Sequence, residues 1–170
     1  LIRGKAHLLA DDVNTDIHCS SKYHPGRDNA YVAQHAFEQL APGFAARLAR
    51  GDVIVAGRNF GNNSSREQAV HILRLMGVGA IVAASFGRQF FRNCINIGLP
   101  ILECPEAVVD ITEGDDIDVD LATGQIFNRT NGHQYQANAL PDFVLKIADA
   151  GGIVNFLKTH DIQELMQKSE

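Results

Sequence analysis

Cysteine is scarce in this chain of 170 residues, and its spacing excludes several classes of site. The three cysteines, Cys19, Cys94 and Cys104, contain no Cys-x-x-Cys pair and stand at no zinc-ligand spacing from a histidine. They predict reduced thiols in a reducing compartment rather than a disulfide framework. For the same reason, we expect no complete metal or iron–sulfur site within this chain.

Long apolar runs and blocks of positive charge are missing as well. No stretch approaches the roughly 18 apolar residues that a membrane-spanning helix needs. The N-terminal residues lack the charged, apolar and small-residue pattern of a signal peptide, so the expected location is the cytoplasm. The net charge is −5, the pI is about 5.8, and no long basic block occurs, which disfavours nucleic acid or a membrane surface as a partner.

The pattern that is present predicts an α/β fold, and the length fits a single domain over residues 1–170. Three short, nearly continuous apolar segments are typical of strands buried on both faces of a parallel sheet. These segments are residues 52–57, 80–85 and 99–104. Helical spacing of apolar residues in 67–77 and 87–98 places a helix between successive strands, which predicts parallel crossovers.

The flanking segments complete the expected architecture. Residues 6–17 predict a short strand followed by a polar turn. Residues 115–137 alternate apolar and polar side chains between turn signals, which is typical of antiparallel hairpins. Residues 140–170 are helical in pattern, with an interruption at Gly151–Gly152. The expected fold is therefore a largely parallel core sheet with an antiparallel β section.

A sharply bounded polar stretch, GRNFGNNSSREQAV at residues 57–70, lies between an expected strand and an expected helix. Ser64 or Ser65 can cap this helix, and Ser65 with Gln68 matches a capping box. Free backbone N–H groups, the helix dipole and the Arg66 guanidinium would together bind an anion, either a carboxylate or a phosphate. The loop also leaves the carboxyl end of a parallel strand, where open α/β sheets bind ligands.

Two further observations bear on this stretch. Neither a P-loop nor a dinucleotide-binding glycine pattern occurs in it. The alternative reading is a well-capped helix after a polar loop, with Arg66 solvated.

Residues 59–68, NFGNNSSREQ, match a family hallmark, Asn-Phe-Gly-x-Gly-Ser-Ser-Arg-Glu-His. Residues 80–104 match the family's next strands, and residues 12–16, DVNTD, match its Asp-x-x-Thr-Asp element. In this order, and over nearly the whole chain, the sequence resembles the small subunits of isopropylmalate isomerases (3-isopropylmalate dehydratases). These subunits correspond to the swivelling domain of aconitase, so the resemblance implies an aconitase-type swivelling β/β/α domain.

The resemblance also implies an activity. The chain would be half of a hydro-lyase that dehydrates and rehydrates a hydroxy di- or tricarboxylate, in the first place 3-isopropylmalate in leucine biosynthesis. A large partner subunit, in a heterodimer or heterotetramer, would carry a [4Fe-4S] cluster that acts as a Lewis acid on the leaving hydroxyl. No cofactor is then expected on this chain, and we expect activity only in the presence of the large subunit.

Site roles follow from the resemblance, residue by residue. Ser64 would be the catalytic base, acting as an alkoxide that the helix N-terminus and Arg66 stabilise. Asp16 would orient a catalytic group across the subunit interface. Ser65 and Arg66 would bind the remote carboxylate of the substrate, and Asn63 would lie beside them in the substrate site.

Residues 18–30 are expected to form an exposed, mobile substrate-specificity loop. Lys22 and His24 stand in the family's Arg- or Lys-Tyr-Leu tripeptide and are expected to contact the substrate. His24 in place of Leu removes an apolar contact that an isopropyl group would favour. Arg27 can bind a further carboxylate, as in an aconitate- or homoaconitate-like substrate, or be a solvated loop residue.

Two departures from the family pattern keep other functions open. Asn62–Asn63 stands where a Gly usually ends the pair, although Asn tolerates positive φ better than most residues. Gln68 stands where the family has His. The chain can therefore also serve a homoaconitate, dimethylmalate or citramalate type of hydratase. A non-catalytic anion-binding module and an enzyme acting on a phosphate ligand are the remaining alternatives.

Overall fold

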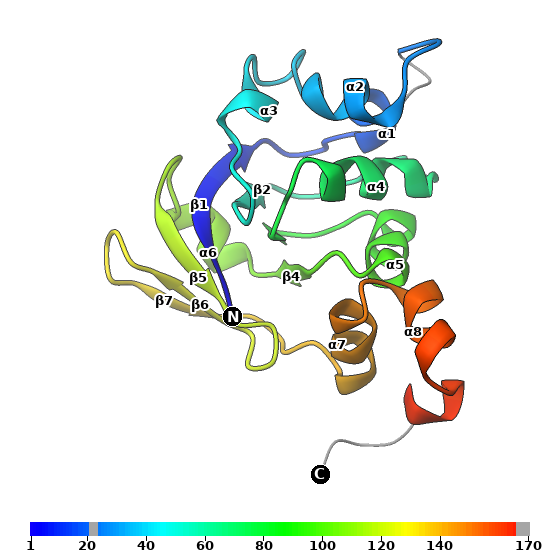
Figure 1. Ribbon diagram of the computed structural model, residues 1–170. Helices are drawn as coiled ribbons and strands as arrows, with labels where there is room; N and C mark the ends of the chain where they lie inside the picture. The colour runs from blue at the N-terminus through cyan, green and yellow to red at the C-terminus, as the bar shows by residue number, and fades with distance from the viewer. Residues whose placement is uncertain (21–23, 166–170) are drawn as a thin grey trace.

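The structure, a computed structural model, describes residues 1–20 and 24–165. Strands and helices alternate from β2 to α6, and a small antiparallel section and a helical C-terminal part follow (Figure 1). The strands are β1 Ile2–Leu9, β2 Val53–Ala56, β3 Ala80–Ala83, β4 Ile101–Glu103, β5 Asp116–Val119, β6 Gln125–Asn128 and β7 Gln134–Gln136. The helices are α1 Thr15–His18, α2 Asn29–Gln34, α3 Phe44–Arg47, α4 Glu67–Leu75, α5 Arg88–Ile97, α6 Pro105–Asp110, α7 Asp142–Asp149, α8 Ile153–Thr159 and the 3-10 helix η2 Ile162–Leu165.

The strands form one sheet in the order β4-β3-β2-β1-β5-β6-β7. The neighbours from β4 to β1 are parallel, and those from β1 to β7 are antiparallel. The expected α/β fold, with a parallel core and an antiparallel section, is confirmed. The central position of β1 was not visible in the sequence. Its first half pairs with β5 and its second half with β2, so one strand joins the two sections.

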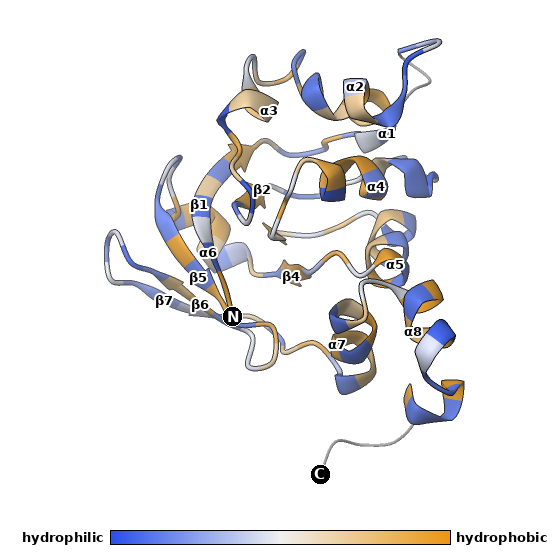
Figure 2. Cartoon of the chain, in the orientation of Figure 1, coloured by the Kyte–Doolittle hydropathy of each residue, from blue (hydrophilic) through white to orange (hydrophobic). Residues whose placement is uncertain are grey.

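The two faces of the parallel section are buried in different cores. Ile54 and Ala56 of β2 belong to the core under α2, α4 and α5, whereas Val53 and Val55 belong to the core on the opposite face, which includes Ala107 of α6. Because every residue of β2 and β3 is buried, these strands contain none of the polar alternation of a half-exposed strand. Figure 2 shows the apolar strands between the helix layers.

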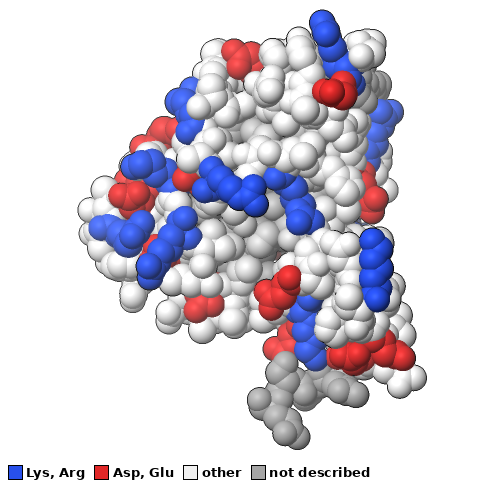
Figure 3. Space-filling model, viewed as in Figure 1, with Lys and Arg blue, Asp and Glu red and all other residues white. Residues whose placement is uncertain are grey.

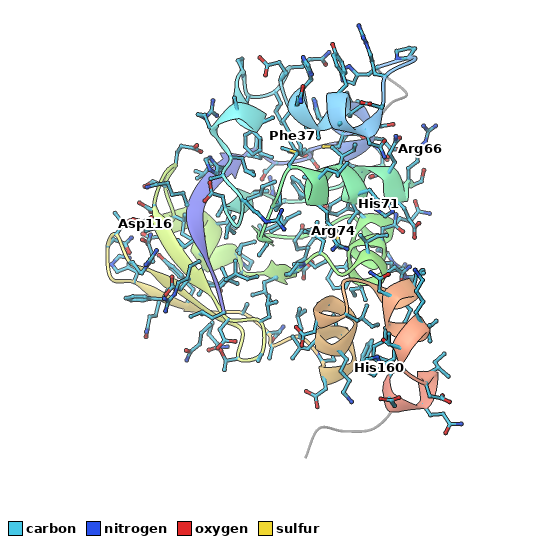
Figure 4. The ribbon with its side chains drawn as sticks, viewed as in Figure 1. Phe37, Arg66, His71, Arg74, Asp116 and His160 are labelled. Carbon is cyan, nitrogen blue, oxygen red and sulfur yellow. The ribbon has the colours of Figure 1, made fainter. Side chains whose placement is uncertain are left out.

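The C-terminal helices extend the helical layer beside α5. The expected interruption at Gly151–Gly152 is confirmed: both glycines have positive φ, 73° and 115°, between α7 and α8. Arg74 of α4 joins this turn to the end of α5, since its Nη1 donates to the carbonyls of Ile97 at 2.6 Å and Gly151 at 2.9 Å. Figure 4 shows Arg74 pointing toward this region.

Two short helices, α1 and α6, were not expected from the sequence. Asn14 caps α1, accepting a hydrogen bond of 3.0 Å from the Asp16 N–H, and Pro105 begins α6. Figure 3 shows basic and acidic side chains on the same face of the molecule, with no extended block of one sign. Among the described residues, no helix has the length and apolar content needed to cross a bilayer.

Candidate active site

The polar loop between β2 and α4 contains three residues in the left-handed backbone conformation. Asn59, Gly61 and Asn63 have φ of 56°, 79° and 54°. A Cβ added to Gly61 would lie 2.2 Å from Cγ of Phe90, so this position admits only glycine. Asn63 adopts the conformation that a glycine would take most easily, and asparagine tolerates it. The replacement of the family's Gly therefore leaves this turn intact.

Backbone hydrogen bonds fix the loop between two other segments. The N–H of Phe60 donates to the Ser85 carbonyl at 3.0 Å, and the N–H of Gly87 donates to the Phe60 carbonyl at 2.9 Å. On its other side, the N–H of Gly61 donates to the Val13 carbonyl at 2.9 Å. The loop is thus held against the approach to α5 and against the segment that leads into α1.

This arrangement brings Ser64 to Asp16. Ser64 Oγ donates to Asp16 Oδ1 at 3.0 Å, and only 2% of Ser64 is exposed. Asp16 is half-buried in α1, where the Asn14 cap fixes its backbone. The Ser64 hydroxyl is therefore oriented by a carboxylate of the same chain and does not point into packed hydrocarbon.

The expected capping box at the start of α4 is wrong. The helix begins at Glu67 with Arg66 as its N-cap, and no side-chain cap hydrogen bond occurs there within residues 1–20 and 24–165. Gln68 turns away from its own helix: its Nε2 donates to Asn29 Oδ1 at 2.8 Å, and its Oε1 accepts from Ser20 Oγ at 3.4 Å. A helix start whose N-cap side chain makes no capping hydrogen bond suits an anion.

The residues around this helix start are exposed. Asn63, Ser65 and Arg66 all reach the surface, and Figure 4 shows Arg66 at the outer end of α4, near α1 and α2. A guanidinium, a hydroxyl and uncapped amides suit a carboxylate or a phosphate. Glu67 is the one acidic group of the first turn and opposes an anion there, so Arg66 must supply the positive charge.

The proposed specificity residues form a second group, which precedes α2 and packs on Tyr31 of that helix. Arg27 Cζ lies 4.5 Å from the Tyr31 ring centroid, in cation–π geometry. The His24 ring lies 5.9 Å from the Tyr31 ring, and Tyr31 stacks on His35 at 4.1 Å. His24 and Arg27 thus both contact Tyr31, but no direct contact joins them to Ser64 in the described structure. Lys22 lies outside the described residues.

Ser20 and Asn29 connect these two groups, and sequence reasoning did not single out either of them. Both are hydrogen-bonded to Gln68, at separations of 48 and 39 residues along the chain. The only available signal was the departure of Gln68 from the family's His.

The three cysteines lie in different parts of the fold and are all buried. Burial raises the pKa of the Cys19 and Cys94 thiols well above the usual value and also raises the pKa of Cys104. The thiols are therefore protonated at neutral pH, a form that does not bind metal well. Within residues 1–20 and 24–165, no cluster of three or more His, Cys, Asp or Glu side chains could hold a metal ion.

Several cavities lie away from Ser64. One of about 400 Å³ is lined by residues of α7, α8 and η2, including Lys146, Phe156 and His160. Another, of about 160 Å³, lies beside His24 and is lined also by His18 and His35. Beside the buried Ser64, the polar groups of Asn63, Ser65 and Arg66 instead lie at an open surface, which a second protein surface would have to cover to exclude water.

Comparisons with known proteins agree with one another. The Aconitase C-terminal domain family matches residues 21–107. The 3-isopropylmalate dehydratase small subunit of Caldicellulosiruptor saccharolyticus is 44% identical over 93% of this chain and 91% of its own length. Small subunit 1 of the same enzyme from Archaeoglobus fulgidus is 45% identical over 92% of this chain and 96% of its own length.

A solved structure extends the agreement to the fold. The crystal structure of 3-isopropylmalate dehydratase from Methanocaldococcus jannaschii superimposes with a TM-score of 0.84 at 36% identity, covering 98% of this chain and 96% of that one. Sequence identity at this level over nearly the full length of both chains reflects common descent. The chain therefore belongs to the family of 3-isopropylmalate dehydratase small subunits, within the aconitase C-terminal domain family.

Proposed function

We propose that the chain is the small subunit of a hydro-lyase that interconverts 3-isopropylmalate and its dehydrated product in leucine biosynthesis. The observation that carries the proposal is the Ser64–Asp16 hydrogen bond beside the uncapped start of α4. It supplies a positioned proton acceptor next to a carboxylate-binding surface. These are the two elements that removal of a proton from a carbon next to a carboxylate requires.

In the proposed reaction, a C–H bond and the neighbouring C–OH bond break and a C=C bond forms. The proton leaves the carbon and goes to Ser64 Oγ, and the substrate hydroxyl leaves as hydroxide. Asp16 orients Oγ and receives the proton of the Ser64 hydroxyl, at the 3.0 Å distance observed. The hydroxide takes up a proton through solvent to become water, and Asp16 releases its proton to solvent, which restores the starting carboxylate. The amides of α4 and the Arg66 guanidinium stabilise the negative charge that develops.

Binding of the substrate's remote carboxylate is assigned to Ser65 and Arg66, with Asn63 beside them. Arg66 is exposed and lies at the N-cap of α4, so its planar fork can form two parallel hydrogen bonds to a carboxylate. This geometry suits a phosphate as well. The family membership favours the carboxylate.

The large subunit is the proposed partner, in a heterodimer or heterotetramer, and the proposed location is the cytoplasm. Relatives are named small subunits, which implies a large one. A [4Fe-4S] cluster is proposed on that partner, and its chemistry would be Lewis-acid polarisation of the leaving hydroxyl. The residues of this chain hold the proton and bind the carboxylate, and the large subunit would cover the open surface around Ser64.

A related tricarboxylate is the second candidate substrate, because Arg27 is exposed and rests on Tyr31. The ring supports the guanidinium without using its N–H groups, which leaves them available for an additional carboxylate.

The test is reconstitution of the chain with its large subunit, followed by assay on 3-isopropylmalate, homocitrate, citrate, citramalate and dimethylmalate. Formation of the unsaturated acid is followed by absorbance. The proposal expects no turnover by this chain alone and highest kcat/KM on 3-isopropylmalate with the pair. A preference for homocitrate would favour the second candidate. Binding of sugar phosphates without turnover of any hydroxy acid would refute both.

A further inference from the structure

Gln68 lies in the first turn of α4, beside Arg66, and joins this helix to residues near both ends of the proposed specificity loop, residues 18–30. Its amide Nε2 donates to Asn29 Oδ1 at 2.8 Å, and its Oε1 accepts from Ser20 Oγ at 3.4 Å. A glutamine amide carries one donor group and one acceptor, so a single side chain can satisfy both partners. The Ser20 contact is near the outer limit for a hydrogen bond, so the Asn29 contact is the stronger one.

The two partners of Gln68 belong to different segments. Ser20 is buried and follows α1, which carries Asp16. Asn29 begins α2, directly after Asp28, whose Oδ1 accepts from the Tyr31 N–H at 2.9 Å and caps that helix. Gln68 therefore links the start of α4 both to the segment after α1 and to the first turn of α2.

The first turn of α2 also supports the specificity residues. Tyr31 lies under the Arg27 guanidinium at 4.5 Å and beside the His24 ring at 5.9 Å. A continuous set of contacts therefore runs from Gln68 through Asn29 and α2 to Arg27. A shift of α2 relative to α4 would move Arg27 and His24 relative to Arg66.

We propose that Gln68 is a positioning residue for substrate discrimination. Its amide holds α2, and with it His24 and Arg27, at a fixed distance from the carboxylate-binding surface at Arg66. The inference rests on the proposed function, because it assigns the two groups to opposite ends of one substrate. It does not place Gln68 in contact with the substrate.

The first test needs no activity and uses the full chain alone. Gln68→Met keeps the side-chain length and removes the hydrogen bonds to Ser20 and Asn29. Amide hydrogen exchange over residues 24–31 should rise about three- to tenfold, as expected for the loss of one neutral hydrogen bond that restrains local opening. Gln34→Met is the matched control: Gln34 is exposed at the end of α2, and its replacement should leave the exchange unchanged.

The second test uses the assembled enzyme. Gln68→Met should raise KM about three- to tenfold while kcat stays within about twofold, because misplacement weakens binding without removing the base. It should also change the ratio of kcat/KM between 3-isopropylmalate and homocitrate. Asn29→Ala should act like Gln68→Met, and the double variant should be no worse than either single one. Asn29→Asp keeps an acceptor for Gln68 Nε2 and should retain the wild-type KM.

The outcomes separate this proposal from the proposed function. Unchanged exchange over residues 24–31 in Gln68→Met overturns the positioning role, whether or not the assembled enzyme is active. Faster exchange with an unchanged KM and an unchanged substrate ratio also overturns it. A reconstituted pair that turns over no hydroxy acid refutes the proposed function. The exchange experiment then still decides whether Gln68 holds α2 against α4.

Discussion

Ser64 Oγ donates a 3.0 Å hydrogen bond to Asp16 Oδ1, although 48 residues separate the two in sequence. The two motifs that carry the family resemblance, one at residues 12–16 and one at 59–68, therefore lie in contact within this chain, through this bond and through the Gly61 N–H to the Val13 carbonyl. The contact makes Asp16 the hydrogen-bond partner of the proposed base, and its expected role across the subunit interface stays a prediction.

Replacement of Asp16 by asparagine removes the negative charge but keeps a hydrogen-bond acceptor for Ser64. Asp16→Asn keeps an oxygen that accepts from Ser64 Oγ, but it cannot receive the serine proton as a carboxylate does. We expect kcat of the assembled enzyme to fall by about 10²- to 10⁴-fold, the usual contribution of a positioned base, with KM little changed. Steady-state kinetics measure this. If Asp16→Asn turns over at the wild-type rate, the carboxylate has no part in proton transfer.

The turn at Gly61 should be intolerant of any side chain. Gly61→Ala adds strain at a φ of 79° and places a Cβ 2.2 Å from Phe90 Cγ, so the free energy of unfolding should fall by about 3 kcal/mol or more. Gly114→Ala is the matched control, since Gly114 has a φ of 86° and no atom within 4 Å of the added Cβ. It should cost only about 1–2 kcal/mol. Urea denaturation distinguishes them, and equal losses would show that the clash with Phe90 is relieved.

Position 63 should tolerate only residues that readily adopt the left-handed backbone conformation. Glycine adopts a φ of 54° without strain, whereas a β-branched residue is strained there. Asn63→Gly should leave the free energy of unfolding within about 1 kcal/mol, whereas Asn63→Val should lower it by about 1–3 kcal/mol. Thermal unfolding of the isolated chain provides the measurement. Indistinguishable melting temperatures for the two variants would contradict the account of this turn.

Asp52 makes part of the stability depend on pH. Burial alone would raise its pKa, but hydrogen bonds from the N–H groups of Lys5 and Ala49 and from the His7 ring outweigh burial and hold the pKa below its usual value. Since the folded-state pKa is depressed, this stabilisation is complete above the unfolded pKa of about 3.9 and is lost as the pH falls through the lower, folded value.

The measurement is the melting temperature of the isolated chain between about pH 7 and pH 3. Asp52→Asn should lower the melting temperature at neutral pH and flatten its fall in acid. Asp149→Asn, at an exposed position on α7, should follow the wild-type curve. An acid profile that is identical in wild type and Asp52→Asn would rule out this contribution.

The sequence predicted those parts of the fold that local pattern controls. The strands at residues 52–57 and 80–85 were identifiable because both faces of β2 and β3 are buried, which leaves an uninterrupted apolar run. The hairpins of residues 115–137 were identifiable from turn glycines and alternation. The four residues of α1 are too few to show a helical period, so this helix could not be predicted.

The sequence supplied a set of candidate site residues, which stay predictions, but it did not supply the contacts among them. Spacing correctly placed Ser64 before a helix, and the family resemblance named Asp16 without its contact to Ser64. The same spacing wrongly predicted that Gln68 would cap that helix, because a capping box is a local pattern and the actual partners are distant in sequence. Tertiary hydrogen bonds to Ser20 and Asn29 outcompeted the local one.

The most direct test of the central claim is kcat of the reconstituted enzyme carrying Ser64→Ala, measured on 3-isopropylmalate beside the wild type. The account predicts a loss of about 10²- to 10⁴-fold in kcat. Thermal unfolding and assembly with the large subunit should remain normal, since a small buried side chain is replaced by one of similar size. Wild-type turnover by a correctly assembled Ser64→Ala enzyme would contradict the assignment of Ser64 as the base.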